Sequence, residues 1–170
     1  MNKLPALQAS PRWGACLLMA VSLALPPLAF ASANACVRKL HDHGQRFSPQ
    51  ALGRQAVTEV SSTPNANDPG HPIRWTKTSL DGSWVLTAEC RSCPAGKTVT
   101  GLSLTGKRAL PCGLAHGLSQ AAVVKLLGPP DERRGAQFVY LYPPTERNQA
   151  MTLTFVDDQL SSTQWDFYFE

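Results

Sequence analysis

A short apolar segment ended by glycine and proline most constrains what this chain can fold into. Ser119 precedes residues 120–127, and Gly128-Pro129-Pro130 follow them. A serine hydroxyl caps the start of a helix, whereas glycine followed by proline ends one. Apolar residues within the segment form one stripe, so the pattern predicts a helix over residues 120–127. So short a helix does not persist alone in water, and we expect it to pack on a sheet.

Three strand patterns follow this helix, at residues 138–142, 151–156 and 160–169. The first is apolar on both faces, which is typical of a covered strand. The second alternates between apolar and polar residues, and Asp157-Asp158 predict a turn into the third. In a regular strand the side chains of Leu160 and Trp165 would point to opposite faces of the sheet. We therefore expect a bulge near residues 161–163 or a change of face.

The chain before the helix contains a hairpin pattern and a weakly patterned region. Asp81-Gly82 lies between alternating runs and predicts a hairpin over residues 73–90. A β-branched run follows at 97–104, with a bulge expected at Gly101. Residues 36–72 are expected to be loosely structured, apart from a short helix that starts at Ser48. The predicted fold is α+β: short helices packed on one face of a small antiparallel sheet, with an extra N-terminal β-hairpin region, in a single domain at 73–170.

Residues 1–35 have the pattern of a secretory signal peptide. A basic start with Lys3 and Arg12 precedes an apolar run over residues 14–31, and small residues lead to a cleavage site after Ala35. The alternative is a membrane anchor, but Pro26-Pro27 interrupt the run. We therefore expect an exported protein.

Charge argues against a nucleic-acid partner. After residue 35 the chain has 14 Lys and Arg against 12 Asp and Glu, which is too small an excess to attract a polyanion. The charge is unevenly spread, because residues 36–112 hold 10 basic and 5 acidic residues, while residues 113–170 hold 4 and 7. We interpret this as two solvated faces of opposite sign.

Four cysteines remain after the expected cleavage, at positions 36, 90, 93 and 112. An even number in an exported chain predicts two disulfides, with three possible pairings. Cys90–Cys93 with Cys36–Cys112 is favoured, because the second bond would tie the N-terminal segment to the start of the helix. Cys36 also follows the cleavage site directly, so lipidation is the alternative, although Ala33 stands where a lipoprotein carries a leucine-like residue. Contact with the membrane is expected only if Cys36 is lipidated.

Catalytic and metal-binding patterns are weak. Cys90-x-x-Cys93 has the spacing of a redox motif, but it leaves a strand and runs into Pro94 instead of opening a helix. As a zinc site the same cysteine pair lacks a second pair of ligands. His41-Asp42-His43 has the ligand types of a metal site, but it lies near a chain end, and we interpret these histidines as isolated and exposed. We expect no enzyme activity, no metal and no small-molecule cofactor.

The segment from Gly117 to Asp131, GLSQAAVVKLLGPPD, resembles the opening motif of the SmpA/OmlA-like envelope proteins related to BamE. The similarity extends through residues 140–142 and through LTFVDDQL at 153–160. It implies helices on one face of a three-stranded antiparallel sheet, as in the β-lactamase-inhibitor-protein-like fold group, and binding of proteins instead of catalysis. The glutamate usual within the motif helix is Ala122 here.

Aromatic side chains on the C-terminal strands are the candidates for a protein-binding surface. They are Tyr140, Tyr142, Trp165 and Tyr168, since tyrosine and tryptophan dominate binding hot spots. Together with the resemblance, the first hypothesis is an exported protein of the periplasm or the periphery of the outer membrane. It would bind another envelope protein and support outer-membrane assembly or integrity. The alternatives are an inhibitor or immunity-type protein that blocks a partner enzyme, and a thiol-disulfide enzyme.

Overall fold

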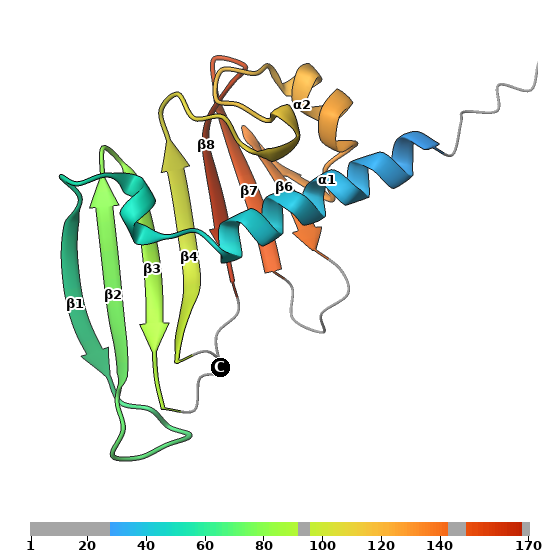
Figure 1. The fold of residues 1–170 in the computed structure, drawn as a ribbon. Coiled ribbons are helices and arrows are strands. Elements are labelled where there is room, and N and C mark those ends of the chain that lie inside the picture. Colours follow the sequence, from blue (N-terminus) through green and yellow to red (C-terminus); the bar gives the residue numbers. More distant parts are fainter. Residues whose placement is uncertain (1–27, 92–95, 143–148, 168–170) are drawn as a thin grey trace, which may run out of the picture.

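The computed structural model describes residues 28–91, 96–142 and 149–167 (Figure 1). Strands make up most of the regular secondary structure of the described residues. They follow two helical elements at the N-terminal end and enclose two more. In chain order the elements are α1 (Leu28–Gln45), η1 (Pro49–Leu52), β1 (Val57–Thr63), β2 (Ile73–Leu80), β3 (Ser83–Glu89), β4 (Lys97–Thr105), η2 (Pro111–Gly113), α2 (Gln120–Leu127), β5 (Glu132–Arg134), β6 (Gln137–Tyr142), β7 (Gln149–Val156) and β8 (Gln159–Asp166).

The strands form one eight-stranded antiparallel sheet in the order β1-β2-β3-β4-β8-β7-β6-β5. The expectation of a small sheet with an extra hairpin region is therefore wrong, and the fold is mostly β. The reason is the pairing of β4 with β8, which runs from Gly101 opposite Asp166 to Thr105 opposite Ser162. This pairing joins the N-terminal hairpin to the C-terminal strands, so the two predicted parts are one sheet.

Both α-helices lie on the same face of the sheet, and α1 crosses it diagonally (Figure 1). Among residues 35–45 of α1, for which burial is described, the buried stripe consists of Cys36, Val37, Leu40, His41 and Gly44. Its spacing repeats every three to four residues, as expected for a helix that packs on one side. Residues 36–72 thus contain most of α1, together with η1 and β1, where the sequence predicts little regular structure.

Helix α1 approaches the sheet closely because residue 44 is glycine. A Cβ atom at this position would lie 2.9 Å from Cζ of Phe167 and 3.0 Å from Cγ of Trp165. Trp165 is completely buried and Phe167 is 7% exposed. The core therefore forms where α1 meets the middle of the sheet, at β8 and the residue that follows it.

Local predictions from turns and caps are confirmed. The Ser119 hydroxyl accepts a hydrogen bond from the backbone N–H of Ala122 at 3.2 Å, and Gly128 has a φ of 80° directly after α2. Asp81 and Gly82 both have positive φ in the β2–β3 turn, with values of 49° and 79°. Both predicted bulges occur, as register shifts in the β3–β4 and β7–β8 pairings.

The helices cover only part of the sheet. Helix α1 contacts β4 and β6, whereas β2 and β3 are contacted on this face by the single turn of η1. Strands β1 and β2 therefore extend beyond the α-helices (Figure 1). None of the helices in the described ranges is long and apolar enough to cross a membrane.

Candidate functional site

The aromatic residues predicted to bind a partner lie inside the protein. Tyr140 is 2% exposed, and its hydroxyl donates a hydrogen bond to the carbonyl of Gly128 at 3.1 Å. Burial raises the pKa of Tyr140 to about 12, because the phenolate would lose its hydration. Trp165 is buried beneath α1, and Tyr142 is half-buried and stacked on His41. Tyr168 lies outside the described residues. The predicted surface is therefore corrected: Tyr140 and Trp165 are core residues, and a partner cannot reach them.

The cysteines hold the helical layer in place. Cys36 on α1 and Cys112 on η2 form a disulfide with their Cα atoms 5.9 Å apart, which is the favoured pairing. Cys90 is also disulfide-bonded, and Cys93 lies outside the described residues. Because the Cys36 sulfur is in a disulfide, it cannot at the same time carry a lipid.

His116 is not hydrogen-bonded to the serine beside it. His116 lines a hollow of about 520 Å³ together with Asp157 and Ser161, which are the residue types of a catalytic triad. However, the Ser161 hydroxyl donates to the carbonyl of Thr154 at 3.0 Å, and the His116 Nε2 atom lies 3.4 Å from the Thr163 hydroxyl. An activated serine would instead donate to an imidazole. Burial lowers the pKa of His116, and the described residues contain no cluster suited to a metal.

The strongest candidate for a binding site is a pair of hollows on either side of η1. One, of about 420 Å³, lies between η1 and the sheet, and the other, of about 540 Å³, lies between η1 and α1. Lys39 and Arg46 line the α1 side, and Arg54 and Lys97 line the sheet side. We call the two hollows with these four cations the basic surface.

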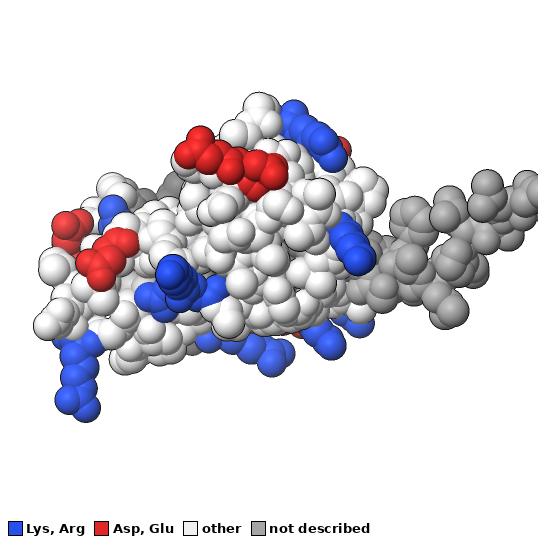
Figure 2. All heavy atoms as spheres, turned by 90° about the horizontal axis from the view of Figure 1, so that it is seen from above, with Lys and Arg blue, Asp and Glu red and all other residues white. Residues whose placement is uncertain are grey.

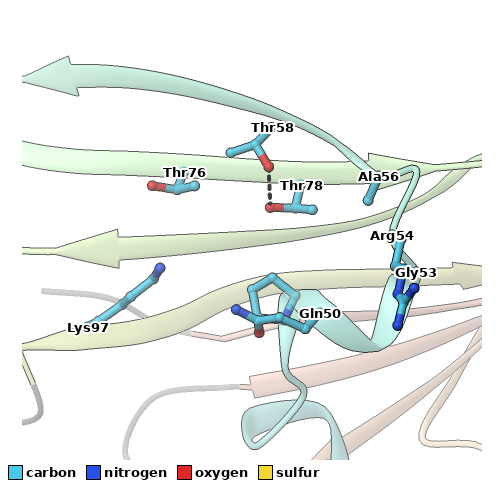
Figure 3. A pocket seen from close by; sticks show the side chains of 9 residues that line it. Gln50, Gly53, Arg54, Ala56, Thr58, Thr76, Thr78 and Lys97 are labelled. Carbon is cyan, nitrogen blue, oxygen red and sulfur yellow. Dashed lines mark hydrogen bonds between the residues drawn. The ribbon is translucent and has the colours of Figure 1, made fainter.

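Local structure explains how η1 separates the two hollows. Pro49 starts this single turn, and Leu52 anchors it with only 4% exposure. Gly53 has a φ of 128°, which turns the chain so that Arg54 follows at the rim of the hollow. In Figure 3, Gln50 projects into the space between Arg54 on one side and Lys97 on the other.

The floor of the sheet-side hollow is a row of threonines. Alternation along the strands places Thr58 of β1 opposite Thr78 of β2, and their hydroxyl oxygens are 3.3 Å apart (Figure 3). Thr76 lies two residues along β2 and lines the same hollow. The floor therefore offers hydroxyl groups that donate and accept hydrogen bonds, with an alanine and a proline in the wall.

The charge of the basic surface is not neutralised within the described chain. Asp42 is the single carboxylate that lines either hollow, against four cations. The ion pairs formed by the described residues are Arg134 with Glu132 and His71 with Asp68, so none involves the basic surface. Figure 2 shows basic side chains along the lower edge of the view, which is the side where the helices lie in Figure 1.

The basic surface cannot be recognised in the sequence, apart from one indication in the distribution of charge. The excess of basic residues in 36–112 is visible in the composition, but we interpreted it as an ordinary solvated face. Only the fold brings Arg46, Arg54 and Lys97 to adjoining hollows. The chain matches no family model, no curated protein and no solved structure.

Proposed function

We propose that this protein is an exported, non-enzymatic protein of the cell envelope that binds another protein through the basic surface. The observation that carries the proposal is the group of four cations around η1 without ion-pair partners in the described chain. An acidic segment of the partner would supply the missing charges. Such complementarity mainly increases the association rate and the specificity of binding.

The lining of the hollows favours a protein segment over a flat anionic surface. Phe47 and Ala51 provide apolar contacts beside Arg46, while Gln50 and the threonine floor provide hydrogen-bonding groups. A protein segment with acidic and small apolar side chains can use all of these groups together. Each exposed ion pair contributes up to about 1 kcal/mol, so we expect moderate affinity that weakens as salt is added.

Export is supported by the position of the expected cleavage site in α1. Burial is described for residues 35–45 of α1; the buried residues among them begin at Cys36, directly after Ala35, so cleavage there would leave these described contacts in the mature chain. The disulfides are typical of an oxidising compartment. Since Cys36 is in a disulfide, the proposal places the mature protein in the periplasm without a lipid anchor.

The resemblance to SmpA/OmlA-like proteins supports a role in outer-membrane assembly or integrity. The segments that carry it are α2, β6, β7 and β8, in which the three strands are hydrogen-bonded neighbours. This part of the chain forms the opposite end of the sheet from β1. The proposed binding surface therefore lies mostly on residues that precede the resembling segment.

Photo-crosslinking tests the proposal in the cells that make the protein. A photoreactive amino acid replaces Gln50, which projects into the basic surface, and the crosslinked product is identified by mass spectrometry. We expect another envelope protein crosslinked through an acidic segment, and loss of the product in Arg46→Glu and Arg54→Glu variants.

The matched control is Arg134→Glu, which makes the same change of charge on β5, outside the basic surface. It should leave the crosslink intact. A product that survives both substitutions at the basic surface, or that is lost equally in the control, would exclude recognition by these cations. A crosslinked hydrolase or toxin would instead support the inhibitor alternative.

A further inference from the structure

The two edges of the sheet differ in how well they are protected from pairing with another strand. Edge strand β5 has three residues, Glu132-Arg133-Arg134, and Pro129-Pro130 lie just before it. Short, charged edges near proline are the usual protection against association. This edge of the sheet is therefore closed to a further strand.

Edge strand β1 is less protected, because it is longer and less charged than β5, although Pro64 directly follows it. It contains seven residues, Val57-Thr58-Glu59-Val60-Ser61-Ser62-Thr63, which are all exposed. Glu59 is its single charged residue, and Val57 and Val60 are 62% and 53% exposed. A strand of this length with β-branched residues and an unpaired backbone edge is suited to pairing with another strand.

The sequence of β1 is compatible with pairing to itself. In an antiparallel pair centred on Val60, Val57 faces Thr63, Thr58 faces Ser62 and Glu59 faces Ser61 of the other copy. The two strands then overlap over their full length, and no glutamate lies directly opposite another. Lys77 lies opposite Glu59 on β2, so it offsets the charge of the glutamate within each chain.

We propose that two copies of this chain associate through β1, around a two-fold axis that passes between the two Val60 residues perpendicular to the sheet. The sheet then continues across both chains, and the two valine side chains pack against each other at the axis. Such an isologous contact is the commonest type in homodimers.

The proposed dimer would place both basic surfaces on one side of the assembly. Val60 lies opposite Thr76, which lines the sheet-side hollow, so Val60 and the hollow are on the same face. Antiparallel pairing about this axis keeps that face on the same side in both copies. An acidic partner with two segments could then bind both copies at once, which raises the apparent affinity.

Sedimentation analysis of the purified chain with its disulfides intact tests the association. We expect the wild-type chain to be a dimer and Val60→Lys to dissociate at least roughly tenfold more readily, because two ammonium groups would meet at the axis. Val156→Lys is the matched control, since Val156 is 57% exposed on β7, outside the pairing edge. A wild-type monomer, or equal weakening by both substitutions, would overturn the proposal.

A cysteine at the axis provides a second test, which reports the register directly. Val60→Cys should give a covalent dimer band in denaturing, non-reducing electrophoresis. Val156→Cys should give a monomer band, because its dimer would have no covalent link. Absence of the covalent product from a folded Val60→Cys dimer would refute the register. If the chain is monomeric but Gln50 still crosslinks an acidic partner, the dimer is excluded while the proposed function stands.

Discussion

Replacing Gly44 by alanine tests the contact between α1 and the sheet. In an exposed helix this change is stabilising by up to about 1 kcal/mol, because glycine has the greater conformational freedom to lose on folding. Gly44 is buried instead, and its missing Cβ would lie 2.9 Å from the ring of Phe167 and 3.0 Å from that of Trp165. The structure therefore predicts the opposite sign from helix propensity.

The size of the effect follows from these two contacts. Distances near 3.0 Å are too short for carbon atoms, so the rings or the helix must move, and overpacking of this kind costs about 1–3 kcal/mol. After subtraction of a gain in helix propensity of about 1 kcal/mol, we expect Gly44→Ala to lower the free energy of unfolding by up to about 2 kcal/mol.

Urea unfolding measures this change through the midpoint and slope of the transition. The matched control is Gly44→Ala in a Phe167→Leu background, where the ring atom nearest to the new methyl group is absent. Gly44→Ala should lower the free energy of unfolding by less in that background than in the wild type. The difference is the coupling energy between positions 44 and 167. Stabilisation by Gly44→Ala in the wild-type chain would refute the docking of α1 on Trp165 and Phe167.

Three further predictions concern the disulfide, the buried histidines and the cap of α2. Cys36→Ala combined with Cys112→Ala removes a cross-link between residues separated by 76 positions, and should lower the free energy of unfolding in urea by about 4 kcal/mol. A decrease below about 1 kcal/mol would contradict the chain-entropy argument. Burial lowers the pKa values of His41 and His116, so the unfolded chain takes up protons first, and stability should fall as the pH drops below about 6.5. Unfolding midpoints at pH 7.5 and 5.5 check the sign, and greater stability at the lower pH would be inconsistent with neutral buried histidines. Ser119→Ala removes the N-cap of α2 and should lower the free energy of unfolding, measured by thermal unfolding, by about 1 kcal/mol. An unchanged stability would show that the cap hydrogen bond is absent.

The sequence predicts those parts of the fold that depend on neighbouring residues. Helix α2 is bounded by Ser119 and Gly128, and the β2–β3 turn is formed by Asp81 and Gly82. These residues set backbone conformation or satisfy terminal N–H groups on their own, so their effect can be recognised without the rest of the chain. The bulges could be predicted for the same reason. Gly101 within β4 indicates the first, and a change in the parity of apolar residues within β8 indicates the second.

The missed parts depend on residues that are far apart in the sequence. Gly101 pairs with Asp166, and nothing within either strand indicates the other. In α1 the buried stripe includes His41 and Gly44, which weaken the apolar pattern, and the helix begins in the expected signal peptide. Strand β1 has no alternation to detect, since all of its residues are exposed.

The candidate site could not be predicted for a related reason. Arg54 follows η1, Thr76 belongs to β2 and Lys97 begins β4, so the hollow that they line exists only after the sheet has formed. The aromatic residues of the C-terminal strands looked suitable for binding because the sequence does not show which face α1 covers. Once α1 lies across β8, Trp165 becomes a core residue.

Binding at the basic surface is tested most directly by amide hydrogen exchange of the chain, measured alone and in complex with the partner that photo-crosslinking identifies. We expect added protection in the peptides that contain η1 and residues 54–58, together with the start of β4 at Lys97, and no change over β5 and β6. Protection confined to β5 and β6, with exchange around η1 unchanged, would contradict the proposed binding surface.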